Sequence, residues 1–330
     1  MTLGIGIRFD GFDRLSDSLE IVREAEQAGA GRIWMAEHMG YREAVVGCMA
    51  YAMSTETATV VPTAISPYLW HPTPTAMSLA TLTDVAPGRV GVAIGVGNPL
   101  FLGESGVEPV RPVRAVREFI ECLRALWTGE AVTYDGEFFR LAGARMAFAP
   151  PEPIPIYVAA TRERMLRLTG RIADGVVLSG GLTLAHVRYS LGQIAEGARA
   201  AGRDPAALRS AAFLYFAVSA DGREAVDYLR GRLAFLFRNR TMADNIRSSG
   251  LPIDHEAIIA AVARRDMETA KRLVPDDAVD AFAVGGTPAN CRDRLAAYLE
   301  TGVTEPAIQI RGSPEGRKLA LDVLREFAAG

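Results

Sequence analysis

Short apolar runs alternate with longer amphipathic stretches along almost the whole chain. Apolar runs bounded by turn residues are typical of buried strands, and apolar residues three and four positions apart are typical of helices. The pattern predicts eight strands, at residues 3–8, 32–36, 58–65, 90–94, 156–160, 175–178, 211–218 and 307–310.

Helical stretches follow the predicted strands, and one small hairpin interrupts them. The hairpin is expected at residues 132–140, across Asp135 and Gly136, and residues 221–275 are helical but the least clearly patterned. The other predicted helices span residues 15–28, 45–52, 73–84, 113–127, 165–172, 184–201, 288–301 and 315–328.

Regular alternation of strand and helix predicts an α/β fold with a parallel sheet. Eight repeats in 330 residues fit a (β/α)8 TIM barrel with insertions better than an open doubly wound sheet. We therefore expect residues 1–330 to form a single barrel domain, with a helical insertion at about residues 221–280.

A dinucleotide-binding sheet is the main alternative fold, and its glycine-rich turn is missing. That turn, G-x-G-x-x-G, would follow the first strand, but the first strand here continues into Phe9, Asp10 and Gly11. Gly95 and Gly97 supply only two of the glycines after the fourth strand, where we expect a loop and not a helix.

Composition narrows the choice of partners. The net charge is −3 and no basic run stands out, so a nucleic-acid surface is not expected. No apolar run reaches roughly 18 residues, so we expect no membrane span. Cys48, Cys122 and Cys291 show no C-x-x-C spacing, which argues against a disulfide framework or a zinc site. The chain enters a strand without a signal sequence, so we expect a cytoplasmic protein.

The active site of a (β/α)8 barrel lies at the carboxyl ends of its strands. The chain places an acid and an imidazole, Glu37 and His38, directly after the second strand. The other residues expected at strand ends, and hence around a ligand, are Phe9, Thr63, Ala64, Ile65, Gly97, Asn98, Ala159, Ala160, Thr161, Arg162, Ser179 and Gly180.

The ends of the fifth and sixth strands have the composition of an anion site. Small residues let backbone N–H groups approach an anion, and a helix N-terminus near Thr161 adds its dipole. Thr161 and Ser179 add hydroxyl donors, and Arg162 adds positive charge. The pattern predicts a phosphate here; the alternative is that the small residues only form tight turns.

Glu37 and His38 are candidates for general acid–base work or for holding a polar ring. The alternative is that His38 only supports other residues. No H-x-H or H-E-x-x-H spacing is present, so no metal site is expected. Neither Lys271 nor Lys318 lies at a predicted strand end, which disfavours Schiff-base chemistry. An anion site with few strong nucleophiles suits a bulky cofactor that carries the chemistry itself.

Several segments resemble the bacterial luciferase-like superfamily of flavin and deazaflavin enzymes. Within it, the chain is most similar to the methylenetetrahydromethanopterin reductase type, which uses coenzyme F420. The likeness is good over about residues 1–200 and weakens between about 221 and 280. It is carried by residues 34–38, 67–72 with the helix through 80–82, 95–98, 155–160 and 170–176.

The resemblance implies a (β/α)8 barrel with insertions that forms a homodimer. It also implies an acid–His contact with the cofactor ring at Glu37 and His38, and a non-prolyl cis peptide near Thr63, Ala64 and Ile65. The cofactor phosphate would lie at Ala160, Thr161, Arg162, Ser179 and Gly180.

Two positions depart from the family pattern. The acid before His38 is Glu37, where the family has mostly Asp. Several deazaflavin members carry an acid after the fourth strand, where this chain has Asn98. Asparagine can hydrogen-bond a ring carbonyl but cannot act as an acid, so the expected catalytic group is Glu37 or His38, with Asn98 beside them.

We therefore expect an F420-dependent oxidoreductase that moves a hydride between the deazaflavin C5 and a small organic substrate. One alternative is an FMN-dependent luciferase-like monooxygenase, which would need a flavin reductase as partner. A second alternative is a catalytically silent cofactor-binding barrel, to which Asn98 lends support. Separate binding of F420 and of FMN would distinguish the first two, and a lack of turnover with reduced cofactor across many acceptors would favour the third.

Overall fold

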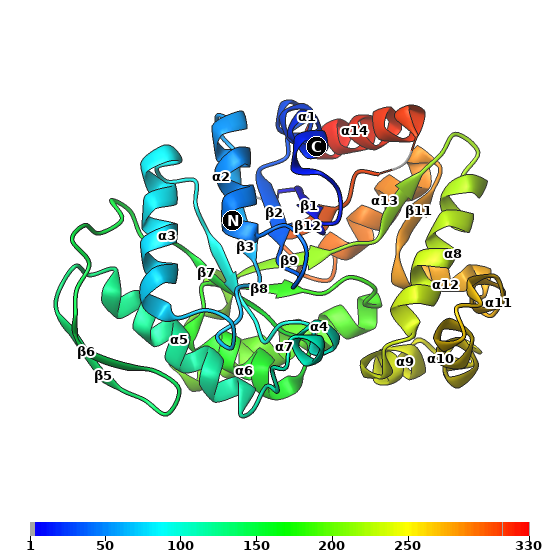
Figure 1. Cartoon of the computed structure of the whole chain (residues 1–330). Coiled ribbons are helices and arrows are strands. Elements are labelled where there is room, and N and C mark those ends of the chain that lie inside the picture. Colours follow the sequence, from blue (N-terminus) through cyan, green and yellow to red (C-terminus); the bar gives the residue numbers. More distant parts are fainter. Residues whose placement is uncertain (1–3, 312, 330) are drawn as a thin grey trace. The chain divides into compact units, whose positions relative to one another are not determined.

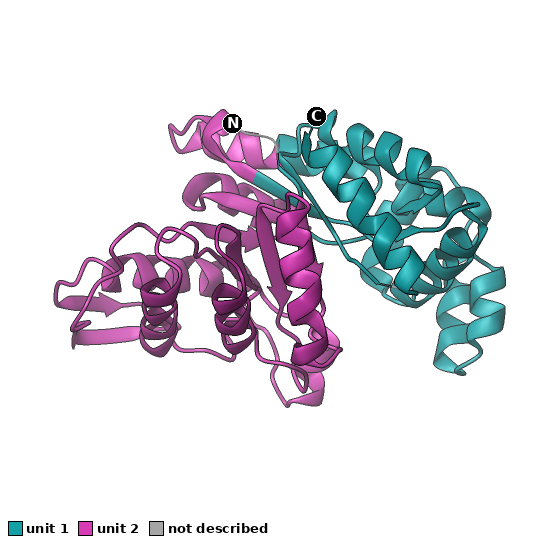
Figure 2. Ribbon diagram, turned by 90° about the horizontal axis from the view of Figure 1, so that it is seen from above, with its two compact units in different colours: residues 1–5, 178–192, 210–330 teal, residues 6–177, 193–209 magenta. Residues whose placement is uncertain are grey.

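The computed structural model describes residues 4–311 and 313–329, and these fall into two compact units. Unit 2 comprises residues 6–177 and 193–209 (Figure 2, magenta). Unit 1 comprises the described residues of 1–5, 178–192 and 210–330 (Figure 2, teal). The helix α7 (Leu184–Ala200) contributes residues to both ranges.

Unit 2 holds six parallel strands whose residues are almost all buried. Continuous burial on both faces explains why these strands have uninterrupted apolar sequences. β1 pairs with β2, β2 with β3, β4 with β7, and β7 with β8, and bridges at Val60–Val90 and Ile65–Ile94 link the β3 and β4 segments. The six strands are β1 (Gly6–Phe9), β2 (Arg32–Ala36), β3 (Thr59–Thr63), β4 (Val92–Ile94), β7 (Ile156–Ala159) and β8 (Gly175–Leu178, its last residue counted in unit 1).

Helices of unit 2 begin where the sequence provides caps. The Glu43 carboxylate accepts hydrogen bonds from the N–H groups of Val45 and Val46 at the start of α2, and Pro72 opens α3 after the cap His71. The predicted hairpin is confirmed as β5 (Val132–Asp135) and β6 (Arg140–Ala144). The helices are α1 (Leu15–Gln27), α2 (Ala44–Ser54), α3 (Pro72–Val85), α4 (Pro99–Glu104), α5 (Pro112–Leu126), α6 (Glu163–Ile172) and the short 3₁₀ helix η1 (Pro205–Ala207).

Unit 1 contains two further parallel strands, β9 and β12, and a separate parallel pair, β10 with β11. Its strands are β9 (Arg209–Phe213, counted in unit 1 from Ser210), β10 (Phe216–Val218), β11 (Val284–Gly286) and β12 (Glu305–Ile308). Its helices are α8 (Arg223–Phe237), η2 (Arg240–Met242), α9 (Ala243–Ser249), α10 (His255–Ala263), α11 (Met267–Arg272), α12 (Asp276–Phe282), α13 (Pro288–Leu299) and α14 (Pro314–Ala329).

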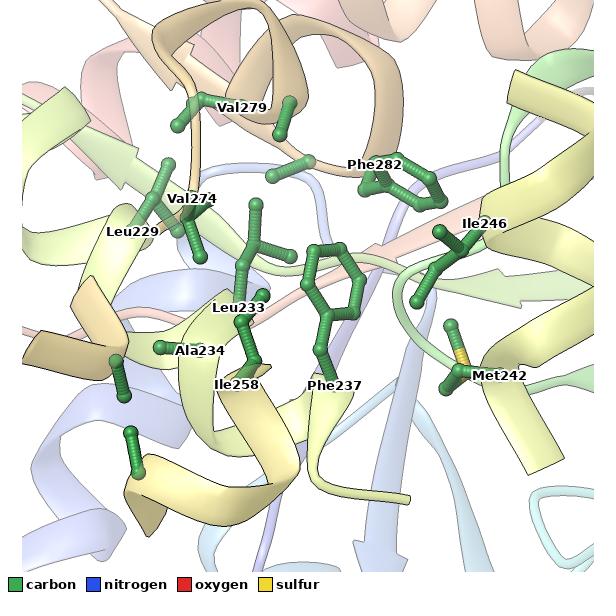
Figure 3. Packing of buried hydrophobic residues seen from close by; sticks show 14 residues of the cluster. Leu229, Leu233, Ala234, Phe237, Met242, Ile246, Ile258, Val274, Val279 and Phe282 are labelled. Carbon is green, nitrogen blue, oxygen red and sulfur yellow. The ribbon is translucent and has the colours of Figure 1, made fainter. Parts of the chain in front are cut away.

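A hydrophobic cluster holds the helices α8 to α12 together (Figure 3). Leu233 and Phe237 of α8 and Phe282 of α12 are completely buried in it, and the two phenylalanine rings meet edge to face with centroids 5.0 Å apart. Burial of such side chains stabilises each by roughly 1.5–3 kcal/mol. The stretch with the weakest sequence pattern is therefore a packed helical body with its own core.

The predicted (β/α)8 barrel is confirmed. All eight parallel strands, the six of unit 2 with β9 and β12, are members of one sheet. Figure 1 labels β1, β2, β3, β7 and β8, and it also labels β9 and β12. The single-domain boundary at residues 1–330 stays a prediction. In the part of the chain that the structure describes, no helix is both long enough and apolar enough to cross a bilayer.

Two predicted segments were wrong in detail. One strand was predicted at 211–218, and the structure has two, β9 and β10. The prediction merged them because the apolar residues continue through the break between the two strands. The glycine-rich segment after β4 leads into the helix α4, and not into a loop, because Asn98 caps it and Pro99 opens it. An unbroken apolar run carries no signal for where a strand ends.

A buried carboxylate fastens the β5–β6 hairpin to α5. Glu118 is 1% exposed, and it accepts hydrogen bonds from Arg114 Nε (2.8 Å), Phe138 N–H (2.8 Å) and Glu137 N–H (3.2 Å). Burial raises the pKa of Glu118, but these three donors together hold its net pKa below the usual 4.5. The ionised form is therefore favoured in the folded protein.

Replacing Glu118 with Gln should lower the free energy of unfolding by about 1–3 kcal/mol at pH 7, because a buried acceptor of several donors is impaired. Because the pKa of Glu118 is lower in the folded protein than in the unfolded chain, the ionised carboxylate stabilises the fold at pH values above the unfolded pKa. That stabilisation is lost as the pH falls through the folded pKa. The difference between wild type and Glu118→Gln in urea unfolding should therefore shrink below pH 4.5. The exposed neighbour Glu121→Gln is the control, and equal losses in both variants would contradict the role of Glu118.

Candidate active site

The ends of β2, β3 and β4 surround a small recess in unit 2. This recess brings together residues from strand ends that are distant in the sequence, as expected for the carboxyl ends of parallel strands. Its walls are mostly small or apolar. They are formed by Glu37, His38, Met39, Ala64, Ser66, Leu69, Gly97, Asn98, Phe101 and Leu102.

The Glu37 carboxylate joins three segments of the site. Its Oε2 accepts a hydrogen bond from Ala44 N–H at 2.9 Å, and its Oε1 accepts one from Trp70 Nε1–H at 2.7 Å. Glu37 thereby ties the end of β2 to the start of α2 and to the loop before α3. Burial raises the pKa of Glu37, and the two hydrogen bonds oppose that rise without cancelling it.

The His38 ring lies among aromatic side chains. Phe12 stacks on it with centroids 5.3 Å apart, and Phe101 meets it at 5.5 Å and Tyr41 at 6.5 Å, both edge to face. Burial lowers the pKa of His38 below 6.5, against the opposing charge of Asp10. Its Nδ1 is buried and, among the described residues, has no hydrogen-bond partner. A neutral imidazole with an unused ring nitrogen is suited to bind a ligand or to accept a proton.

Asn98 stands where the chain turns from β4 into α4. Its Oδ1 accepts a hydrogen bond from Leu100 N–H at 3.0 Å and so caps the helix. Because the oxygen has this partner, the side-chain NH₂ is the group that Asn98 can offer to a ligand.

The end of β3 has the backbone that the resemblance implied. The peptide bond between Thr63 and Ala64 is cis. Ile65 is fully buried and pairs with the β4 segment through hydrogen bonds with Ala93 and Gly95. A Cβ on Gly95 would lie 2.9 Å from the Cβ of Ala64, so only glycine fits there.

Phe9 lies apart from this recess. It packs on Tyr51, with centroids 5.2 Å apart, and lines a second recess in unit 2 with Gly11 and Met35. Its contact with a cofactor stays a prediction.

The predicted phosphate residues fall in both units. Ala159 ends β7, Ala160 is buried, and Thr161 and Arg162 are exposed before α6 in unit 2. The exposed Ser179 and half-buried Gly180 follow β8 in unit 1. The phosphate site therefore stays a prediction.

Sequence reasoning missed a buried ion pair and an aromatic enclosure. Arg8 Nη1 and Asp10 Oδ1 are 2.5 Å apart, and their side chains are only 7% and 8% exposed. Both charges act on the pKa of His38. For Arg8, its position as a charged residue inside an apolar strand could have indicated a buried ion pair. Phe12, Tyr41 and Phe101 had none, because each comes from a different loop or helix.

The chain is similar in sequence to one protein family and to named enzymes. Residues 3–305 match the family model described as luciferase-like monooxygenase. The chain is 30% identical over 312 residues to a 5,10-methylenetetrahydromethanopterin reductase from Methanolobus tindarius, which covers 94% of each chain. It is 29% identical to an F420-dependent glucose-6-phosphate dehydrogenase from Beutenbergia cavernae, over 85% of this chain and 83% of that protein.

A solved structure resembles the whole fold. The coenzyme F420-dependent tetrahydromethanopterin reductase of Methanopyrus kandleri superposes with a TM-score of 0.90 at 25% identity. The match covers 99% of this chain and 98% of that one.

The Glu37 hydrogen bonds generate a prediction about stability. Glu37→Met should lower the free energy of unfolding by about 1–3 kcal/mol, because two N–H donors lose their acceptor. In a Trp70→Phe background, where one donor is already gone, the loss should be smaller by about 0.5–1.5 kcal/mol. Urea unfolding of the wild type, the two single variants and the double variant measures this coupling. Strictly additive losses would show that the Glu37–Trp70 bond contributes nothing.

Proposed function

The chain belongs to the luciferase-like monooxygenase family, and we propose that within it the chain is a coenzyme F420-dependent oxidoreductase of the methylenetetrahydromethanopterin reductase type. The two relatives and the solved structure described above have names that include this reductase or F420. The observation that carries the proposal for this chain is the buried, unpartnered Nδ1 of His38 beside a recess at the strand ends.

We propose that a flat ring lies against the residues of the recess. Ala64, Gly97 and the position of Gly95 keep side chains away from the backbone, and Leu69 and Phe101 supply apolar surface. When bound, coenzyme F420 supplies a deazaflavin C5 that gives or takes a hydride. Chemistry of this kind asks the protein to bind, to orient and to exclude water, more than to provide a nucleophile.

Each residue then has a definite task. His38 holds or accepts a proton at Nδ1 in its neutral form. Glu37 is a positioning residue, since both of its oxygens are bonded to Ala44 and Trp70. The NH₂ group of Asn98 donates a hydrogen bond toward the ring. Ser179 and Gly180 are assigned to the cofactor phosphate, as the resemblance implies.

The recess also limits the substrate. Among the described residues, Glu37 and His38 are the only ionisable ones in its walls, and no lysine or arginine is among them. We propose a small organic substrate whose reacting part is uncharged where it enters this recess, because a phosphate would meet the Glu37 carboxylate without a cation to balance it.

Cofactor binding tests the proposal directly. Titration of the purified apo-protein with F420, followed by deazaflavin fluorescence, should show binding at least about tenfold tighter than that of FMN, because the two ring systems differ in their hydrogen-bonding edges. Tighter binding of FMN would favour the monooxygenase, and oxygen consumption with a flavin reductase would then be measured. Binding of neither would contradict the proposal.

His38 should contribute mainly to turnover. His38→Gln should reduce turnover by about 10²–10⁴-fold with the best substrate from a screen of small organic acceptors, while F420 affinity changes little. In the wild type, activity that needs the neutral imidazole should fall as the pH drops through the His38 pKa, below 6.5. His255→Gln, a histidine on α10, is the control. A turnover loss of about twofold or less in His38→Gln would contradict the role.

We further propose that the protein is a homodimer in the cytoplasm. The helix α2 contains no charged residue along its length, and Val46 and Met53 on it are 65% and 74% exposed. On α3, Met77 and Val85 are also exposed. Apolar helix surfaces of this kind are typical of subunit interfaces. The three cysteines are buried free thiols, which suits a reducing compartment.

The oligomeric state is measured by light scattering after size-exclusion chromatography. Wild type should elute as a dimer, and Val46→Lys combined with Met53→Lys should give a monomer, because two charges would be buried in the interface. Phe148→Lys, which alters another exposed apolar side chain, should stay dimeric. A monomeric wild type would contradict the proposal.

A further inference from the structure

The loop between β8 and α7, residues 179–183, is held by a buried asparagine of α9. Asn245 is 3% exposed. Its Nδ2 donates to the carbonyl of Gly181 at 2.7 Å, and its Oδ1 accepts from both the N–H and the hydroxyl of Thr183 at 3.3 Å. One side chain therefore bonds the backbone on both sides of Leu182.

A buried tyrosine of α13 completes the support. Tyr298 is 1% exposed, and its hydroxyl donates to the carbonyl of Leu182 at 2.9 Å. Thr183 then starts α7, since its hydroxyl oxygen accepts from His186 N–H at 3.2 Å and its carbonyl accepts from Val187 N–H at 2.9 Å. Three consecutive residues of the loop are thus bonded to side chains or to the following helix.

The loop also lies directly against other side chains of unit 1. Gly181 has φ +80°, and a Cβ there would lie 2.2 Å from Leu236 Cδ2 of α8. A Cβ on Gly180 would lie 3.2 Å from the ring of Tyr215. The positive φ of Gly181 favours glycine at that position. Ser179, by contrast, is exposed.

We propose that Asn245 and Tyr298 are positioning residues for the cofactor phosphate. They hold residues 181–183 so that Ser179 and Gly180 keep one backbone arrangement toward the anion; this rests on the proposed function, which assigns the phosphate to those two residues. Pre-ordering a loop reduces the entropy lost on binding. The helical segment α8–α12, which does not follow the strand–helix pattern, thereby has a function: its α9 carries Asn245.

The experiment compares F420 with its phosphate-free 8-hydroxy-5-deazariboflavin chromophore as fluorescent probes. Asn245→Leu and Tyr298→Phe should weaken F420 binding by about tenfold or more, because buried hydrogen bonds of the loop are lost. Affinity for the phosphate-free probe should stay within about twofold. Amide hydrogen exchange over residues 179–187 of the unliganded variants should become faster.

Ser248→Ala is the matched control, because it removes a hydrogen bond within α9 from the Ser248 hydroxyl to the Asn245 carbonyl, and it should keep both affinities. Tyr298→Phe retains its packing, so it decides the question even where Asn245→Leu does not fold. A folded variant that keeps the wild-type preference for F420 over the phosphate-free probe overturns the positioning role alone. A wild type that binds neither probe, or binds both equally, overturns the phosphate assignment in the proposed function and the positioning role with it.

Discussion

The site depends on how the end of β2 accommodates a carboxylate and an imidazole that are both withdrawn from water. Burial of a polar group is costly unless it is hydrogen-bonded. Glu37 meets this requirement through Ala44 N–H and the Trp70 indole, and in doing so connects three segments. His38 does not meet it at Nδ1, which has no partner among the described residues. The two adjacent residues thus differ in their hydrogen bonding. Both oxygens of Glu37 accept hydrogen bonds from the protein, whereas Nδ1 of His38 remains available to a ligand.

The surroundings of His38 favour its neutral imidazole form. Aromatic rings exclude water and favour the neutral ring, while the Arg8–Asp10 ion pair adds two opposing charges. The side-chain oxygen of Asn98 caps α4 by accepting a hydrogen bond from Leu100 N–H. We therefore propose that His38 carries the proton chemistry.

The helical body α8–α12, like Glu37, makes hydrogen bonds that hold a segment at a strand end. Its apolar cluster is independent of the strand–helix repeat, yet Asn245 within it bonds the loop that follows β8. In an enzyme whose cofactor carries the chemistry, the protein's main contribution is the arrangement of such loops. We propose that this helical body affects cofactor binding through its buried hydrogen bonds to the loop.

The sequence by itself determined the α/β class, the barrel, most of the elements and the residues at strand ends, because hydrophobic periodicity and turn residues are local. β2 and β8 were predicted with their observed ends, and Glu37, His38, Ala64, Gly97 and Asn98 do line one recess. Tertiary structure decided the rest. It divided one apolar run into β9 and β10, joined Phe12, Tyr41 and Phe101 around His38, and paired Glu37 with Trp70 and Thr183 with Asn245. Contacts between residues tens of positions apart depend on packing geometry, which no local pattern encodes.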